Sequence, residues 1–142
     1  MSNIIDKLME KDLDTLKEAA KKDLEITRLS KVFNEPFTVT VKEISYKRIT
    51  DLRMLATDDG VADESQFLQF VVTDGIVSPD FGTKELLQKF QVPSKQALYT
   101  KLFKAGELEL IAREVLALSG YGDKAIKKVI NEVKIICMGY RG

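Results

Sequence analysis

Residues 37–44 read Phe-Thr-Val-Thr-Val-Lys-Glu-Ile, and apolar and polar side chains alternate along almost the whole stretch. This alternation predicts a half-buried β-strand. Residues 24–29, Leu-Glu-Ile-Thr-Arg-Leu, alternate in the same way, and Asn34-Glu35-Pro36 between the two segments is a turn signal. We expect the two segments to pair as an antiparallel ribbon. A two-stranded ribbon is marginally stable alone, so its apolar face must lie on helices.

Helical periodicity predicts those helices in the rest of the chain. Ser45, Thr83 and Ser94 are placed to cap three of them, and Gly120 fits a left-handed C-terminal cap. The predicted helices are 46–56, about 63–73, 83–90, 94–103, 107–119 and 123–138. The helix at 63–73 has a wide apolar surface, which is typical of a central helix. Residues 58–60 predict a solvated turn between helices, and residues 74–82 predict a loop.

The predicted fold is therefore α+β and mostly helical, with six to seven helices and a short two-stranded antiparallel β-ribbon near the N-terminal third. We expect a single domain over 1–142. Within it, residues 1–22 form a charged N-terminal helix at the periphery and residues 24–138 form the compact core. The N-terminal helix carries only a narrow apolar stripe among its charges.

Composition excludes several classes of protein. The chain has 142 residues, 44% of them hydrophobic, with 22 basic and 22 acidic side chains, so it can build a core of its own. No apolar run approaches the roughly 20 residues of a membrane span. Ile4-Ile5 is followed at once by Asp6-Lys7, which does not fit a signal-peptide core. With no His and one Cys, Cys137, the chain cannot form His-containing triads, His-containing zinc sites or internal disulfides.

The zero net charge conceals an uneven distribution. Residues 54–83 hold six acids and no Lys or Arg, whereas residues 84–142 hold eleven basic and six acidic side chains. Such segregation can steer a charged partner. Alternatively, the two regions lie beside each other in the fold and neutralise one another.

No motif for chemistry is present. The acidic cluster at 58–64 does not have the spacing of an EF-hand loop. Gly82-Thr83-Lys84 lacks the upstream glycine of a P-loop, and Gly120-Tyr121-Gly122 does not follow a predicted strand. Cys137 lies on the apolar side of a predicted helix and fits a buried structural role. We therefore predict no catalytic, cofactor-binding or metal-ligating residue, and no cofactor.

Two kinds of binding function remain open beside an uncharacterised small enzyme. The basic region 92–104, with Ser94, Lys95, Gln96 and Lys101, fits a short recognition helix of a nucleic-acid-binding regulator. However, a neutral chain lacks the basic footprint of a dedicated nucleic-acid binder. The other kind is a protein-interaction module, in which aromatic residues beside the acidic block form an apolar groove with an acidic rim.

The order of several segments identifies a resemblance. They are Pro36 to Lys42, Ile49-Thr50-Asp51-Leu52-Arg53, Gly75 to Phe81, Glu85 to Phe90, Leu102 to Leu108 and Ile111 to Tyr121. In this order and spacing the chain resembles the XkdN-like tail assembly chaperones of phages and defective prophages of Gram-positive bacteria, over roughly residues 24–135. None of these segments is catalytic, and the resemblance carries over no active-site residue.

The resemblance implies a non-enzymatic chaperone, made in the host cytoplasm and absent from the mature virion. Its expected partners are the tape measure protein and the tail tube protein of the same phage-like element, with self-association as a further expectation. Neither a membrane nor a nucleic acid is expected as a partner. We expect Phe81, Phe90, Tyr99 and Phe103 to contribute to a groove that holds an amphipathic helix of the tape measure protein.

Overall fold

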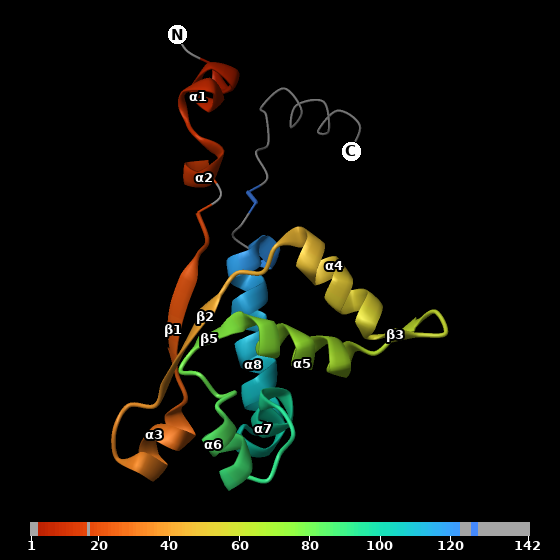
Figure 1. Cartoon of the computed structure of the whole chain (residues 1–142). Coiled ribbons are helices and arrows are strands. Elements are labelled where there is room, and N and C mark those ends of the chain that lie inside the picture. Colours follow the sequence, from red (N-terminus) through yellow and green to blue (C-terminus); the bar gives the residue numbers. More distant parts are fainter. Residues whose placement is uncertain (1–2, 17, 123–125, 128–142) are drawn as a thin grey trace, which may run out of the picture.

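The fold is organised around a small antiparallel sheet and the helices that pack on it (Figure 1). The computed structural model describes residues 3–16, 18–122 and 126–127. The sheet contains β1 (Lys21–Glu25), β2 (Thr38–Lys42) and β5 (Ile76–Ser78), in the order β1-β2-β5. Val39 and Val41 of β2 are completely buried, while Thr38 and Lys42 are exposed, which confirms the half-buried strand predicted there.

Two predictions about the sheet are wrong in detail. The first strand lies at Lys21–Glu25 rather than 24–29, and α3 (Thr27–Phe33) occupies the rest of that segment. The antiparallel pairing itself is confirmed, with Leu24 opposite Val39. The predicted loop at 74–82 contains β5, which pairs with β2 and makes a third strand. A third strand gives the sheet a hydrogen-bonding partner on both sides of β2, so it does not rest on one ribbon alone.

The helices follow the predicted caps closely. They are α4 (Tyr46–Leu55), α5 (Glu64–Gly75), α6 (Lys84–Lys89), α7 (Lys95–Leu102) and α8 (Ala105–Leu116). The hydroxyl groups of Ser45, Thr83 and Ser94 each accept a hydrogen bond from the backbone N–H three residues on, as an N-cap should. The α5 helix is central, as predicted, because it packs on α4, α7 and α8.

The mostly helical α+β class is confirmed. The described residues contain eight α-helices rather than six or seven, because α3 was not predicted and the N-terminal helix is divided. A short π-helical segment, Ala117–Tyr121, follows α8, and Gly120 within it has φ 97°, the left-handed conformation predicted for it. The predicted helix at 123–138, with Cys137, lies outside the described residues except for 126–127.

The N-terminal segment extends away from the sheet (Figure 1). It forms two short helices, α1 (Ile4–Glu10) and α2 (Leu13–Leu16), rather than one helix across 1–22. Asn3 caps α1 by accepting a hydrogen bond from the backbone N–H of Asp6. Neither helix contains a buried residue, so this N-terminal arm, residues 3–16, gains little stability from packing on the rest of the chain.

The turn predicted at 58–60 is a β-hairpin. Its strands are β3 (Thr57–Asp58) and β4 (Val61–Ala62), and Asp59 and Gly60 at the turn both have positive φ. An Asp-Gly pair favours this kind of two-residue hairpin turn. The base of the hairpin is fixed, because the N–H of Asp63 donates to the carbonyl of Ala56 at 2.8 Å and the Thr57 hydroxyl donates to the carbonyl of Arg53 at 2.7 Å. The hairpin therefore projects from the adjoining ends of α4 and α5 (Figure 1).

Candidate partner-binding surfaces

Three of the four aromatic residues predicted to contact a partner lie in the core. Phe81, Tyr99 and Phe103 are all buried. Their rings pack together, with centroid distances of 5.4 Å for Phe81–Tyr99, 6.0 Å for Tyr99–Phe103 and 6.4 Å for Phe81–Phe103. These separations are typical of stabilising aromatic pairs. Phe90, at the C-terminal end of α6, is 42% exposed and lies outside this cluster. The expected open groove is therefore not formed by the four rings together, and their contact with a partner stays a prediction.

Burial also changes the acid–base behaviour of the cluster. Removal of Tyr99 from water raises the pKa of its phenol to about 12, and the nearby negative charge of Asp80 adds to this shift. Tyr99 is therefore neutral throughout the physiological range, and its ring contributes to packing rather than to proton transfer.

A shallow cleft of about 450 Å³ lies where α5 meets α7 and the start of α8. Its lining residues are Ser65, Leu68, Gln69, Thr100, Phe103, Ala105, Leu108 and Glu109. Phe103 thus lines this cleft, although little of its ring is exposed.

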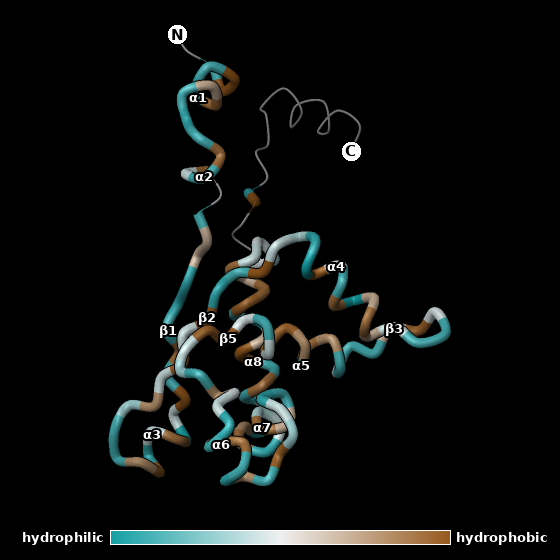
Figure 2. The backbone as a smooth tube through the Cα atoms, viewed as in Figure 1, coloured by the Kyte–Doolittle hydropathy of each residue, from teal (hydrophilic) through white to brown (hydrophobic). Residues whose placement is uncertain are grey.

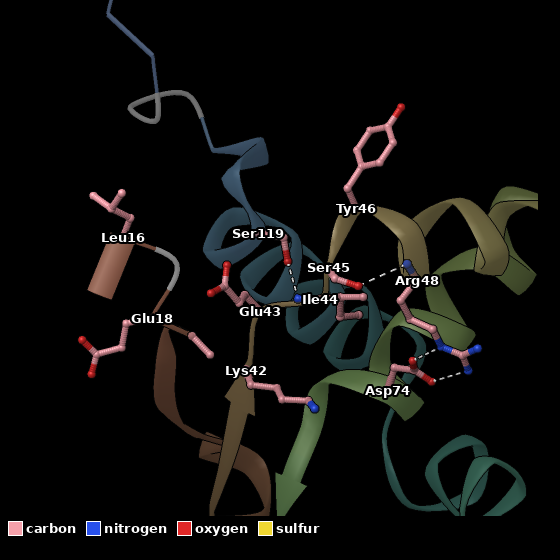
Figure 3. A pocket seen from close by; sticks show the side chains of 11 residues that line it. Leu16, Glu18, Lys42, Glu43, Ile44, Ser45, Tyr46, Arg48, Asp74 and Ser119 are labelled. Atoms are coloured by element: carbon pink, nitrogen blue, oxygen red, sulfur yellow. Dashed lines mark hydrogen bonds and ion pairs between the residues drawn. The ribbon is translucent and has the colours of Figure 1, made fainter. Parts of the chain in front are cut away.

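A larger cleft of about 640 Å³ lies beside the root of the N-terminal arm (Figure 3). Residues from the arm, the β2–α4 connection, α5 and the end of the α8 region line it. Its polar groups largely pair with one another. Arg48 forms a two-point ion pair with Asp74, in which a terminal guanidinium nitrogen lies 3.1 Å from one carboxylate oxygen. The Ser119 hydroxyl accepts a hydrogen bond from the N–H of Ile44 at 2.8 Å. These pairs hold parts of the walls in place, and the side chains of Glu18, Lys42 and Tyr46 also line the cleft.

The arm beside this cleft carries the largest set of unpartnered apolar side chains. Its exposed apolar residues are Ile4, Ile5, Leu8, Met9, Leu13 and Leu16, with exposed fractions from 47% to 82%. Figure 2 shows hydrophobic stretches of backbone, in brown, among hydrophilic ones, in teal, along the arm. An apolar set of this size, outside any core, is characteristic of a surface that meets another molecule.

A second exposed apolar set occurs at the hairpin, and sequence reasoning missed it. Met54, Leu55 and Val61 are 69%, 62% and 71% exposed. Met54 and Leu55 belong to the helix predicted at 46–56, and no contact with a partner was predicted for either. At 100° per residue Met54 lies on the opposite side of α4 from the buried Ile49 and Leu52. Leu55 follows Leu52 by three residues and lies at the edge of that side, so periodicity alone does not mark it as exposed.

Four members of the acidic block lie in the same hairpin or directly after it. Asp58, Asp59, Asp63 and Glu64 are all exposed. We call Met54, Leu55 and Val61 together with these four acids the hairpin tip. In the described part of the chain no ion pair joins residues 54–83 to the basic region that follows. The one ion pair of the acidic block there joins Asp74 to Arg48. This arrangement gives no support to the alternative in which the two regions neutralise each other.

The basic region 92–104 forms α7 and its flanks. Ser94 is occupied as the cap of α7, and Gln96 is half-buried, so Lys95 and Lys101 are the exposed members of the set predicted for nucleic-acid binding. Leu98 and Tyr99 on the other side of α7 are buried. The helix is accordingly explained by its packing, and no further observation favours a nucleic-acid function.

The described residues offer no centre for metal chemistry. Across residues 3–16, 18–122 and 126–127, no group of three or more His, Cys, Asp or Glu side chains is placed to hold a metal ion. No helix among these residues is long and apolar enough to cross a membrane. The features that distinguish the surface are exposed apolar side chains and segregated charge, which define the class of a protein-binding module.

Comparison with known proteins places the chain within that class. The family model for phage XkdN-like tail assembly chaperone proteins matches residues 5–134, and the chain belongs to this family. The resemblance predicted from the sequence is thereby confirmed. A solved structure titled as the crystal structure of the protein yqbn superposes with a TM-score of 0.57. It is 18% identical and covers 79% of this chain and 98% of its own, so the likeness concerns the fold. No curated protein matches.

Proposed function

We propose that this tail assembly chaperone binds the tape measure protein of its own phage-like element and helps to bring tail tube subunits to it. It acts without catalysis, in the cytoplasm of the host cell, and leaves before the virion is complete. The proposal extends membership of the family, which concerns tail assembly, to particular partners.

The observation that carries the proposal is the set of six large apolar side chains exposed on the N-terminal arm. A tape measure protein is a long helical chain that exposes apolar stripes before the tube surrounds it. The exposed apolar surfaces of a small chaperone can cover such stripes, as in other recognition of amphipathic helices. Weak contacts repeated along a long partner give avidity and still permit displacement by tube subunits.

Co-expression with the neighbouring tail genes tests this proposal. An affinity-tagged chain is expected to co-purify with the tape measure protein and to increase its soluble fraction. An unrelated coiled-coil protein of similar length, expressed in the same way, is the control and should not be retained. If the tape measure protein stays insoluble and is not retained, the proposed partner is wrong. A companion series in which Ile5, Leu8 and Leu13 become Gln should reduce retention if the arm contributes.

A further inference from the structure

The hairpin tip combines exposed apolar and acidic groups on one rigid support. In the two-stranded hairpin Asp58 lies directly opposite Val61, so these two side chains emerge on the same face. Met54 and Leu55 belong to the last turn of α4, immediately before β3. The exposed side chain of Val61 thus stands beside the Asp58 carboxylate, and the exposed Met54 and Leu55 precede the hairpin directly.

The negative charge at the tip has no basic neighbour within its own stretch of chain. Residues 54–83 contain no Lys or Arg. Arg53, the adjacent basic residue, is directed toward α5, where its guanidinium carbon lies 4.2 Å from the centroid of the Phe67 ring. This cation–π contact places the guanidinium over the face of a buried ring of α5, although Arg53 itself is exposed.

From this combination we infer that the hairpin tip is a docking surface for a helix that carries Lys or Arg beside its apolar stripe, supplied by the tape measure protein. The inference rests on the function proposed above and adds the site and the chemistry of the segment that it takes. Charge complementarity selects the partner: an acidic rim repels acidic helices and attracts basic ones, while Met54, Leu55 and Val61 contact the stripe.

The hairpin tip is held in place by the hairpin base and by α5, so it is preformed for a partner. Its base is closed by the hydrogen bonds of Asp63 and Thr57 described above, and α5 is anchored in the core through Phe67, Val71 and Val72. A partner that binds such a preformed surface loses little affinity to the ordering of the chaperone.

Two variants separate the charged and apolar contributions. The first is Asp58→Asn, Asp59→Asn and Glu64→Gln. It leaves Asp63 unchanged because its carboxylate caps α5 through the N–H of Gln66. Asn tolerates the positive φ of position 59. The second is Met54→Gln, Leu55→Gln and Val61→Thr, which retains helix and strand propensities.

Each variant has a matched control elsewhere on the surface. Glu25→Gln, Glu35→Gln and Glu85→Gln removes the same charge from exposed positions outside both the arm and the tip. Val32→Thr and Leu110→Gln removes similarly exposed apolar groups, which are 63% and 64% exposed. All variants are first compared by urea unfolding, where unchanged midpoints show that exposed substitutions have not altered the fold.

The probe is the tape measure protein encoded with this chain, co-expressed and captured at several salt concentrations. The charge variant should bind roughly threefold to a hundredfold more weakly at low salt and lose most of the salt dependence. The apolar variant should bind at least about tenfold more weakly at all salt concentrations, and both controls should behave as the wild type does.

If the wild type binds and both tip variants bind equally well, the tip is not the site, although the proposed function stands. If the wild type itself does not bind, the proposed function fails. If the purified tip variants have a lower sedimentation coefficient than the purified wild type, the tip is a surface for self-association instead. That result would overturn the inference.

Discussion

Replacement of Gly75 by Ala tests how closely the two central helices approach. Gly75 is the last residue of α5, and it is buried against Val115 of α8. A Cβ built at this position would lie 2.5 Å from Cγ2 and 2.9 Å from Cγ1 of Val115. Carbon atoms in contact prefer about 3.5–4.0 Å, so the new methyl group would overlap both atoms. Val115 is fully buried, and a Val in a helix has one strongly preferred rotamer, so it cannot turn aside.

The size of the effect follows from two opposing contributions. Overpacking of a filled core costs about 1–3 kcal/mol. Ala also has less conformational entropy than Gly in the unfolded chain, which stabilises the folded state by about 0.4–1 kcal/mol. We therefore expect Gly75→Ala to lower the free energy of unfolding by about 1–2 kcal/mol, measured as a lower urea midpoint with an unchanged slope.

Gly106→Ala is the matched control, because it changes a glycine of α8 whose Cβ would meet no atom within 4 Å. It should be neutral or slightly stabilising. In a Val115→Ala background the two overlapping methyl groups are absent, so adding Ala at 75 should cost much less than in the wild type. Equal stability of the Gly75 and Gly106 variants would refute the close approach of α5 and α8.

Three further predictions concern single residues. Glu107→Gln should lower the melting temperature at neutral pH, because the Glu107 carboxylate accepts two hydrogen bonds from Arg28, at 2.9 Å and 3.0 Å. Hydrogen bonding from Arg28 lowers the pKa of Glu107, so its contribution is present at neutral pH and is lost as the pH falls through that lowered pKa. As the pH falls through this acidic range, calorimetry should therefore show a smaller decrease in melting temperature for the variant than for the wild type. Parallel plots of melting temperature against pH would contradict this. Tyr99 should resist ionisation up to a pH of about 12 in ultraviolet titrations of the folded protein, whereas ordinary phenol behaviour near pH 10 would show that the ring is not buried. Asn34→Ala should lower the free energy of unfolding in urea by about 1 kcal/mol, because φ at this position is 54°. Asn34→Gly should lower it less, since glycine adopts positive φ readily. Equal decreases for the two variants would argue against the left-handed cap.

Local signals predicted the parts of the fold that depend on a few neighbouring residues. The caps at Ser45, Thr83 and Ser94 fixed the starts of three helices, since each cap satisfies backbone donors within its own first turn. Gly120 marked a left-handed position for the same kind of reason. These features need no knowledge of the rest of the chain.

Long-range contacts decided the parts that were predicted wrongly. Residues 24–29 alternate as a strand does, yet Ile26 and Leu29 also have helical spacing, and both are buried. The Arg28 guanidinium contributes to the outcome by donating to Glu107 and, at 2.9 Å, to the carbonyl of Leu102. Partners more than 70 residues away are invisible to a local pattern. The same holds for β5, whose pairing with β2 crosses the whole of α4 and α5.

The candidate site shows why surface function is harder to predict than fold. Aromatic rings in or beside short helices serve equally well as core or as contact surface. Sequence alone assigned Phe81, Tyr99 and Phe103 to the contact, although they are buried. The acidic block, by contrast, was visible in the sequence. What was missing was the turn geometry at Asp59 and Gly60, which brings Val61 back beside Asp58 and next to the end of α4.

The two exposed apolar regions should contribute to binding in different ways, because they differ in how firmly they are held. The arm, residues 3–16, has no buried residue, so a partner that orders it must offset a conformational cost. The hairpin tip is fixed to α4 and α5 before any partner arrives. If both act on one tape measure helix, the tip should set which segments are chosen, through charge, and the arm should add apolar contact once the segment is seated. Tip variants should then alter the choice between basic and acidic helices, whereas arm variants should weaken both alike. Under the function proposed above, this division would help tube subunits to displace the chaperone, because each contact is weak enough to break in turn.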